Sequence, residues 1–140
     1  KTFPSRLVAP QEKIDARPYP GLNMDNLPFF AVIATKAKGQ TLIHDWVFEK
    51  RALYYTELDK LGAQTVLFDP HRISIKGPTP LQAATMTSPP ALRPAAVLLI
   101  GMLGAHGTSV LRDVYMINRG YENLVERLTT LKAKVKIVRS

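Results

Sequence analysis

The sequence predicts an α/β protein made of two tandem units, and three observations indicate this fold class. Residues 39–45 (GQTLIHD) return 68 positions later as residues 107–113 (GTSVLRD). The same 68-residue step aligns Arg51 with Arg119 and Asp25 with Arg93. Short apolar strand patterns also alternate with longer helical ones, at roughly the spacing of a βαβ crossover. Self-similarity at a fixed period is typical of repeated supersecondary units, so we expect parallel strands joined by right-handed crossovers.

The first unit covers about residues 13–77. It opens with a short strand at residues 14–17, which follows a proline-rich entry. Apolar residues between positions 25 and 38 fit a largely buried helix, with Asp25 as its N-cap and Gly39 after its last turn. Residues 41–44 then read as the second strand.

The same unit continues with an amphipathic helix at residues 49–61, which Gly62 ends. Its inward positions are predicted to be Leu53, Leu58 and Leu61. Strands at residues 65–68 and 72–76 should pair as a hairpin through the turn Asp69-Pro70-His71. A hairpin added to parallel strands makes the sheet mixed.

The second unit covers about residues 81–140 and repeats this order. We expect a strand at 82–87, an apolar helix at 93–105 and a strand at 108–111. An amphipathic helix is predicted at residues 119–131, with inward residues Leu124, Val125, Leu128 and Leu131. A closing strand at residues 134–138 completes the unit.

Composition narrows the class of protein. Hydrophobic residues make up 46% and charged residues 21% of the 140 positions, which is typical of a globular fold. The net charge of +8 favours anionic partners, but it is spread along the chain, so nucleic acid ranks below phosphorylated metabolites. The absence of cysteine excludes disulfides and thiol nucleophiles within this stretch and fits a reducing cytoplasm. The longest apolar run has 11 residues, against about 20 for a membrane span, so no membrane is expected.

Three arginines are candidates for binding an anion. Arg51 and Arg119 each fall near the first turn of a predicted helix, where free N–H groups favour negative charge, so together they could clamp a phosphate or carboxylate. The alternative is that each pairs with a neighbouring acid such as Glu49 or Glu122. Arg93 heads an apolar helix, and a cation there is disfavoured unless an anion meets it.

Asp25 admits two roles, as a helix cap or as a general base near these arginines. The three histidines, His44, His71 and His106, lack the spacing of metal ligands. The glycine-rich stretch at residues 101–107 lacks the pattern of a dinucleotide or phosphate-binding loop. We therefore expect neither a metal nor a cofactor.

Four strings in the chain point to one family. They are VFEKR at residues 47–51, ELDKLGA at 57–63, Leu92-Arg93 before an apolar helix, and INRGYE at 117–122. In order and spacing, from about Pro18 onward, they resemble the C-terminal part of the UDP-N-acetylglucosamine enolpyruvyl transferases. The resemblance implies a fold of two domains, each an inside-out αβ barrel of three βαβαββ units, with mixed sheets packed on helices. This chain resembles two of those six units, so its partners would include the N-terminal units outside it.

The resemblance also implies an activity. Members of this family transfer the enolpyruvyl group of phosphoenolpyruvate to the 3-hydroxyl of UDP-N-acetylglucosamine, in the cytoplasm, for peptidoglycan synthesis and hence cell-wall biogenesis and cell shape. Asp25 then matches a catalytic aspartate that accepts the proton of the sugar hydroxyl. Arg51, Arg93 and Arg119 match the arginines around phosphoenolpyruvate, and Val47 matches a further substrate-binding position.

The resemblance places an aspartate where this chain has Ala91. That aspartate is implicated in proton transfer at the enolpyruvyl carbon, and the second domain of the family lies outside this sequence. We therefore expect the 140-residue chain alone to be inactive. The alternative function is a non-catalytic module that binds an anion or a nucleotide sugar and derives from the same fold.

Overall fold

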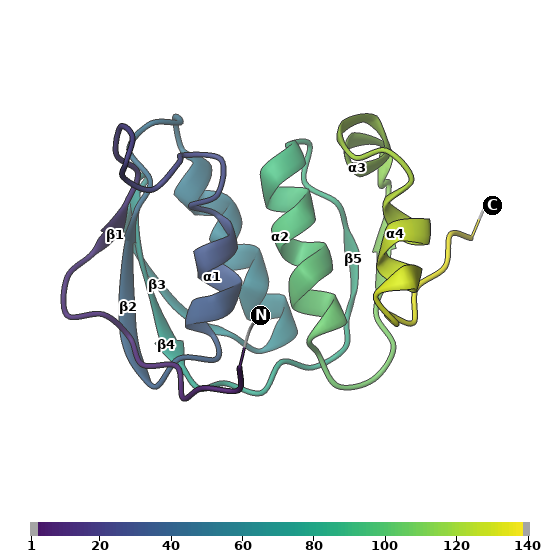
Figure 1. Ribbon diagram of the computed structural model, residues 1–140, viewed down its shortest axis with the longest axis horizontal. Helices are drawn as coiled ribbons and strands as arrows, with labels where there is room; N and C mark the ends of the chain where they lie inside the picture. Colours follow the sequence, from purple (N-terminus) through teal and green to yellow (C-terminus); the bar gives the residue numbers. More distant parts are fainter. Residues whose placement is uncertain (1–2, 139–140) are drawn as a thin grey trace.

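The structure is a computed structural model that describes residues 3–138. The first half contains β1 (Ile14–Asp15), α1 (Phe29–Ala34), β2 (Gly39–His44), the 3-10 helix η1 (Arg51–Leu61), β3 (Gln64–Asp69) and β4 (Arg72–Gly77). The second half contains β5 (Thr85–Thr87), α2 (Leu92–Leu103), β6 (Val110–Arg112), α3 (Tyr115–Gly120) and α4 (Leu124–Thr130). The four strands of the first half form one sheet, α1 and α2 stand side by side, and β5 lies beyond α2 (Figure 1).

The strands pair as the sequence predicts in the first half. The sheet has the order β1-β2-β4-β3, with β1 parallel to β2 and the other two pairings antiparallel. The hairpin turn is held by Asp69, whose Oδ1 accepts the N–H groups of His71 and Arg72, both at 2.8 Å. In the second half β5 is parallel to β6. The expectations of an α/β fold, parallel pairs and a mixed sheet are confirmed.

The strand register refines the 68-residue repeat. Ile43 pairs with Ile14, and its counterpart Leu111, 68 residues on, pairs with Met86. Met86 therefore corresponds to Ile14 but lies 72 residues after it. The first unit carries four more residues than the second between its first strand and its second. These extra residues lengthen the loop that carries Asp25.

The helix expected at residues 25–38 is shorter in the structure and begins later. Its N-cap is Pro28, not Asp25, so the capping role predicted for Asp25 is wrong. Asn23 explains the difference, because its Oδ1 accepts the Asp25 N–H at 2.7 Å and forms a turn ahead of the helix. The Asp25 carboxylate is left free to point elsewhere.

The helix expected at residues 49–61 is a 3-10 helix, and its inward face includes the expected Leu58 and Leu61 but not Leu53. Every third residue from Ala52 to Leu61 is fully buried, namely Ala52, Tyr55, Leu58 and Leu61. This spacing is the three-residue period of a 3-10 helix, whereas the prediction assumed 3.6 residues per turn. Leu53 therefore lies outward, with 40% of its surface exposed. Gly62 ends the helix in the left-handed region, with φ of 88°, as expected.

Two elements expected near the end of the chain differ from the prediction. The helix predicted at residues 119–131 is two helices, α3 and α4, interrupted at Asn123, which has φ of 48°. α4 buries none of its residues fully, but Leu124, Val125 and Leu128 are its half-buried positions, so their predicted inward direction is confirmed. The inward role of Leu131 is wrong, because 77% of its surface is exposed.

The closing strand at residues 134–138 is not formed. The 68-residue step makes this segment the counterpart of β3, and β3 pairs only with β4. Among residues 3–138, no counterpart of β4 stands beside residues 134–138. Their backbone groups have no ladder to join, which explains why this prediction failed.

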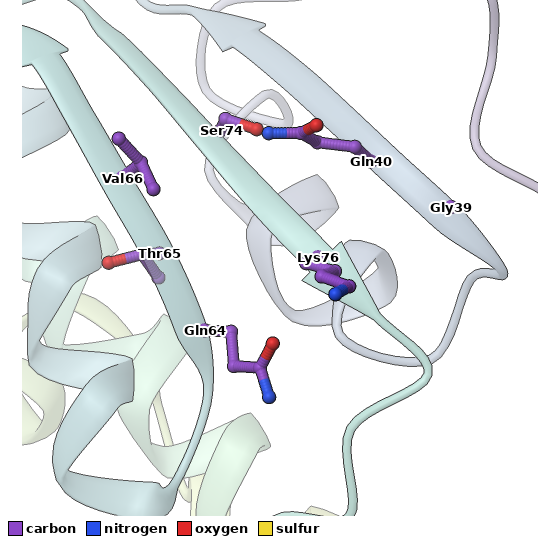
Figure 2. A pocket seen from close by; sticks show the side chains of 7 residues that line it. All are labelled: Gly39, Gln40, Gln64, Thr65, Val66, Ser74 and Lys76. Carbon is purple, nitrogen blue, oxygen red and sulfur yellow. The ribbon is translucent and has the colours of Figure 1, made fainter.

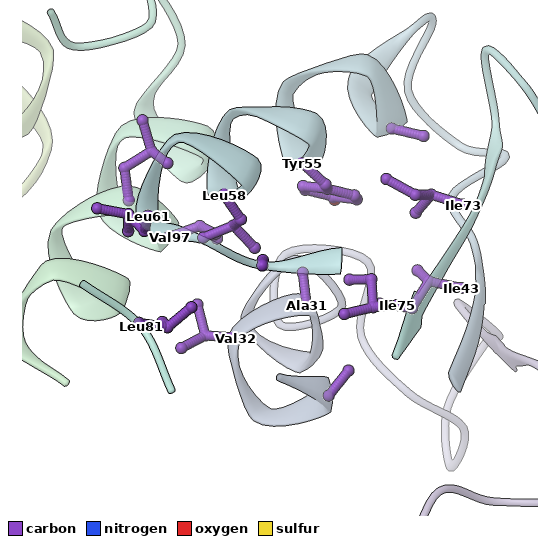
Figure 3. Packing of buried hydrophobic residues seen from close by; sticks show 14 of the residues in the cluster. Ala31, Val32, Ile43, Tyr55, Leu58, Leu61, Ile73, Ile75, Leu81 and Val97 are labelled. Carbon is purple, nitrogen blue, oxygen red and sulfur yellow. The ribbon is translucent and has the colours of Figure 1, made fainter. Parts of the chain in front are cut away.

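One hydrophobic core connects the two halves. In Figure 3, Ile75 of the sheet lies beside Ala31 of α1, with Ile43 and Ile73 further along the sheet, and Val32 of α1 lies beside Leu81. Tyr55, Leu58 and Leu61 of η1 follow one another along the same cluster. Leu81 and Val97 of the second half join the same cluster. Gly101 of α2 allows close approach, because a Cβ there would lie 3.1 Å from Leu61 and 3.2 Å from Leu58. None of the helices within residues 3–138 is long and apolar enough to span a bilayer.

Candidate functional site

A hollow of about 270 Å³ lies where the two halves meet, beside the N-terminus of α2. Its lining combines three of the residues singled out from the sequence with their neighbours: Asp25, Phe48, Arg51, Ala91, Leu92, Arg93 and Pro94. Asp25 comes from the loop before α1, Arg51 from the first turn of η1, and Arg93 from the first turn of α2. One carboxylate and two guanidinium groups thus converge from both halves of the chain.

Asp25 and Arg93 face each other across this hollow. The carboxylate Oδ2 lies 3.6 Å from Nη2 of Arg93, with side chains 45% and 30% exposed. At this distance and exposure the pair is loose enough for an anionic ligand to displace or join it. A cation at the N-terminal end of a helix is unfavourable by itself, and Asp25 supplies the compensating charge.

Tyr121 fixes the other side of Arg93. Nη1 of Arg93 donates to the Tyr121 hydroxyl at 2.7 Å, and the guanidinium carbon lies 5.8 Å from the centre of the Tyr121 ring. Burial by itself would lower the pKa of Arg93, but the Tyr121 hydrogen bond and the Asp25 carboxylate raise it. Arg93 is therefore a fixed, permanently charged group at the mouth of the hollow.

Arg51 is held by a buried carboxylate. Its Nε donates to Oδ2 of Asp45 at 2.6 Å, and its Nη2 donates to Oδ1 of the same residue at 2.8 Å. Both side chains are almost completely buried, at 7% and 0% exposure. Arg51 therefore pairs with an acid, as the alternative interpretation held, but the acid is the buried Asp45 and not Glu49. Arg51 also packs on Phe48, with 4.2 Å from its guanidinium carbon to the ring centre.

Tyr55 completes this buried cluster. Its hydroxyl donates to Oδ2 of Asp45, the oxygen that also accepts Nε of Arg51. Burial raises the pKa of Tyr55, and the neighbouring Asp45 charge raises it further. The hydroxyl therefore remains protonated and acts as a donor.

Two residues expected at the site lie outside the hollow. Arg119 is exposed and falls in the last turn of α3, not in the first turn of a helix as the sequence suggested. Its 68-residue counterpart Arg51 is buried, so the two do not form a matched clamp in this structure. Val47 is 37% exposed and neighbours Phe48 without lining the hollow. Ala91, at the N-cap of α2, contributes no carboxylate.

A second hollow lies on the outer face of the sheet, away from these residues. It measures about 350 Å³ and is lined by Gly39, Gln40, Gln64, Thr65, Val66, Ser74 and Lys76 (Figure 2). Ser74 has 3% of its surface exposed, and its hydroxyl has no hydrogen-bond partner among residues 3–138. No carboxylate lines this hollow. Within the same range, no group of three or more His, Asp or Glu side chains could hold a metal ion.

Sequence reasoning missed Asp45 and Tyr55 as parts of the site. Asp45 belongs to the repeated string and has Asp113 as its counterpart, which is a signal that was available. Tyr55 could have been found from its three-residue spacing with Ala52 and Leu58, once a 3-10 helix is assumed. Tyr121 stands in the string INRGYE, but only the structure shows it beside Arg93.

Comparison with known proteins identifies the family. The family model described as EPSP synthase (3-phosphoshikimate 1-carboxyvinyltransferase) matches residues 3–128. The chain belongs to the EPSP synthase family. Two solved structures are similar to this chain. NikO from Streptomyces tendae superposes with a TM-score of 0.78 at 31% identity, covering 96% of this chain and 31% of that protein. EPSP synthase from Acinetobacter baumannii, with a TM-score of 0.68 at 16% identity over 80% of this chain, shares the fold.

Curated proteins are also similar in sequence. The UDP-N-acetylglucosamine 1-carboxyvinyltransferase of Porphyromonas gingivalis is 45% identical over 121 residues, which is 84% of this chain and 28% of that protein. The enzyme of the same name from Treponema denticola is 41% identical over 125 residues, 89% of this chain and 29% of that protein. The chain thus spans under a third of the length of these relatives. The sequence-based recognition of an enolpyruvyl transferase is confirmed.

Proposed function

We propose that this chain is part of an enzyme that transfers the enolpyruvyl group of phosphoenolpyruvate to the 3-hydroxyl of UDP-N-acetylglucosamine. Residues 13–77 and 81–140 would be two consecutive repeat units of that enzyme, acting with units outside this sequence. Such an enzyme acts in the cytoplasm. It takes part in peptidoglycan synthesis, which builds the cell wall and maintains cell shape. The 140-residue chain alone is inactive under this proposal.

The observation that carries the proposal is the convergence of Asp25 and Arg93 in one hollow, 3.6 Å apart and drawn from different units. The transfer needs a base for the sugar hydroxyl and a cation for the anionic phosphoenolpyruvate. A carboxylate can accept the hydroxyl proton as the oxygen attacks, and a fixed guanidinium can bind the phosphate or the carboxylate of the other substrate. Asp25 and Arg93 supply this pair.

The choice of sugar nucleotide as acceptor is supported by the relatives. The curated proteins at 45% and 41% identity carry the name UDP-N-acetylglucosamine 1-carboxyvinyltransferase. The likeness to the EPSP synthase of A. baumannii, at 16% identity, supports the fold alone. Arg119 and Val47 remain proposed substrate-binding positions, which the units outside this sequence would complete.

The test is an assay of phosphate release by the full-length protein that contains this chain. We expect release when phosphoenolpyruvate is supplied with UDP-N-acetylglucosamine and none when shikimate 3-phosphate replaces the sugar nucleotide. Changing Asp25 to Asn should lower kcat by on the order of 100-fold or more, because the base is lost without a change of shape. Lys13→Gln, a surface change, is the matched control.

Two outcomes would reject the proposal. Phosphate release with phosphoenolpyruvate and shikimate 3-phosphate, but not with UDP-N-acetylglucosamine, would show that the acceptor is a different one. Tight binding of the sugar nucleotide with no release from either acceptor would favour the non-catalytic module, in keeping with alanine at position 91.

A further inference from the structure

We propose that Asp45 and Tyr55 are positioning residues that act through Arg51 to hold Asp25 in place. This inference rests on the proposed function, since it assigns Asp25 the role of base. It gives Arg51 a different task from that of a direct anion ligand. The chain of contacts runs from the sheet to the hollow in four steps.

The first step fixes Asp45 to the sheet. Its backbone N–H donates to the carbonyl of His71 at 2.7 Å, and its own carbonyl lies 3.1 Å from Nδ1 of His71. His71 sits in the hairpin turn that Asp69 closes. The backbone of Asp45 is therefore anchored immediately after β2, on one of the most extensively paired parts of the fold.

The second step fixes the Asp45 carboxylate. Both of its oxygens accept from Arg51, and Oδ2 also accepts from the Tyr55 hydroxyl. The Asp45 and Tyr55 residues are fully buried, so these contacts are not exchanged with water. Tyr55 in turn is locked by its place on the inward face of η1.

The third step passes from Arg51 to the loop before α1. Nη2 of Arg51, which already binds Asp45, donates to the carbonyl of Met24 at 2.7 Å. Met24 directly precedes Asp25 in the chain. The planar guanidinium therefore ties a buried carboxylate to the peptide that carries the proposed base.

The fourth step is the position of Asp25 itself. Its N–H is held by Asn23 at 2.7 Å, while the Met24 carbonyl is held by Arg51, so the peptide between residues 24 and 25 is restrained on both sides. Its carboxylate is then presented 3.6 Å from Arg93. In the longer loop of the first unit, a restraint of this kind keeps the base within reach of the opposing cation.

A stabilising role alone does not explain this arrangement. Replacing a buried ion pair by apolar residues of similar volume is often neutral or favourable for stability. The buried side chains of Asp45, Tyr55 and Arg51 form one hydrogen-bonded group, and Arg51 also binds the backbone of the loop beside the hollow. We explain this arrangement by the requirement that the loop be held in a defined position. Enzymes lose rate steeply when a reacting group is displaced by about 1 Å, on the order of 100-fold.

The experiment compares Tyr55→Phe with Tyr54→Phe in the full-length protein. Each variant removes the hydroxyl group of one of two adjacent tyrosines. The Tyr54 hydroxyl makes no hydrogen bond within the described part of the chain, whereas the Tyr55 hydroxyl binds Asp45. We expect Tyr55→Phe to lower kcat by on the order of tenfold with KM for phosphoenolpyruvate within about twofold of the wild type. Tyr54→Phe should leave both constants unchanged.

Arg51→Lys provides a second variant. Lysine keeps the charge but cannot bridge Asp45 and Met24 as the guanidinium fork does, so the same fall in kcat is expected. An unchanged kcat in Tyr55→Phe would overturn the proposal. A rise in KM for phosphoenolpyruvate with kcat preserved in Arg51→Lys would also overturn it, because Arg51 would then be a direct ligand.

A readout without turnover separates this inference from the proposed function. If the wild-type protein shows no transfer, the proposed function fails, but the restraint on the loop is still measurable. Tyr55→Phe should shift the amide resonances of Met24 and Asp25 in the nuclear magnetic resonance spectrum, and Tyr54→Phe should not. Unshifted resonances in Tyr55→Phe would overturn the positioning role whatever the reaction is.

Discussion

Asp25 shows how one side chain can carry a role that its position in the sequence disguises. Aspartate ahead of an apolar segment is typical of a helix cap, yet Asn23 takes over the local turn and α1 begins after Pro28. The carboxylate is thereby released to face Arg93. The sequence predicts Asp25 as a candidate for the site, but only the structure shows why its carboxylate does not cap the helix.

His44 offers a test of the electrostatics at the residue scale. Burial lowers the pKa of His44, and the positive charges of Lys13 and Arg72 lower it further. Its Nδ1 lies 2.9 Å from Nζ of Lys13, a contact that requires the neutral ring. Because the pKa is lower in the folded than in the unfolded protein, the contribution of His44 to stability is complete above the unfolded pKa and is lost as the pH falls through the folded value.

We therefore predict that the free energy of unfolding of the wild type falls between about pH 7.5 and pH 5, and that His44→Gln reduces this fall. Urea titrations at several pH values measure the effect. His106→Gln, which changes an exposed histidine, is the control. An identical pH dependence in His44→Gln and the wild type would show that His44 is not responsible.

At the element scale, the end of β4 passes close to the end of α1. Gly77 makes this possible, because a Cβ there would lie 2.4 Å from the carbonyl oxygen of Ala37 and 2.5 Å from that of Ala34. These are backbone atoms, which cannot move aside as a side chain can. The sheet and α1 are therefore joined through a position without a side chain.

Gly77→Ala should destabilise the fold by about 3 kcal/mol, because the extra methyl group forces β4 and α1 apart. The midpoint of urea unfolding measures this loss. Gly104→Ala is a matched control, since a Cβ there would lie 3.6 Å from its nearest neighbour, at ordinary contact distance. Equal midpoints for Gly77→Ala and the wild type would contradict the close approach.

The elements also show which parts of the fold the sequence could predict. Strand and helix patterns located β1 to β4 and α2, because alternating apolar residues, glycine stops and the Asp69 turn are local signals. The 3-10 character of η1 was not predictable from the 3.6-residue template. The strand at residues 134–138 failed because strand formation depends on a partner, and β3 shows that this partner is the adjacent hairpin strand.

For the site, the sequence predicted the residue types and the structure supplied their pairing. Asp25, Arg51 and Arg93 were all expected and all line one hollow. The partners Asp45, Tyr55 and Tyr121 were missed because each contact joins residues from different elements. Arg119 shows the limit of the repeat argument, since equivalent positions of two units differ in burial.

At the scale of the whole molecule, the two halves of the chain pack as one body. A single core runs from the sheet through η1 to α2, and Nζ of Lys36 reaches the carbonyl of Gly104, its own counterpart 68 residues on, at 3.5 Å. The hollow lies at this junction and takes its carboxylate from the first unit and its exposed guanidinium from the second. Neither unit alone contains the pair that the proposed chemistry requires.

The most direct test of this account is a calorimetric titration of phosphoenolpyruvate into the full-length protein with UDP-N-acetylglucosamine present. Arg93→Ala should weaken the affinity by on the order of tenfold or more, because a charge-assisted contact to the anion is removed. Arg127→Ala, which removes an exposed arginine of α4 that does not line the hollow, should bind as the wild type does. Wild-type affinity in Arg93→Ala would contradict the claim that this hollow binds phosphoenolpyruvate.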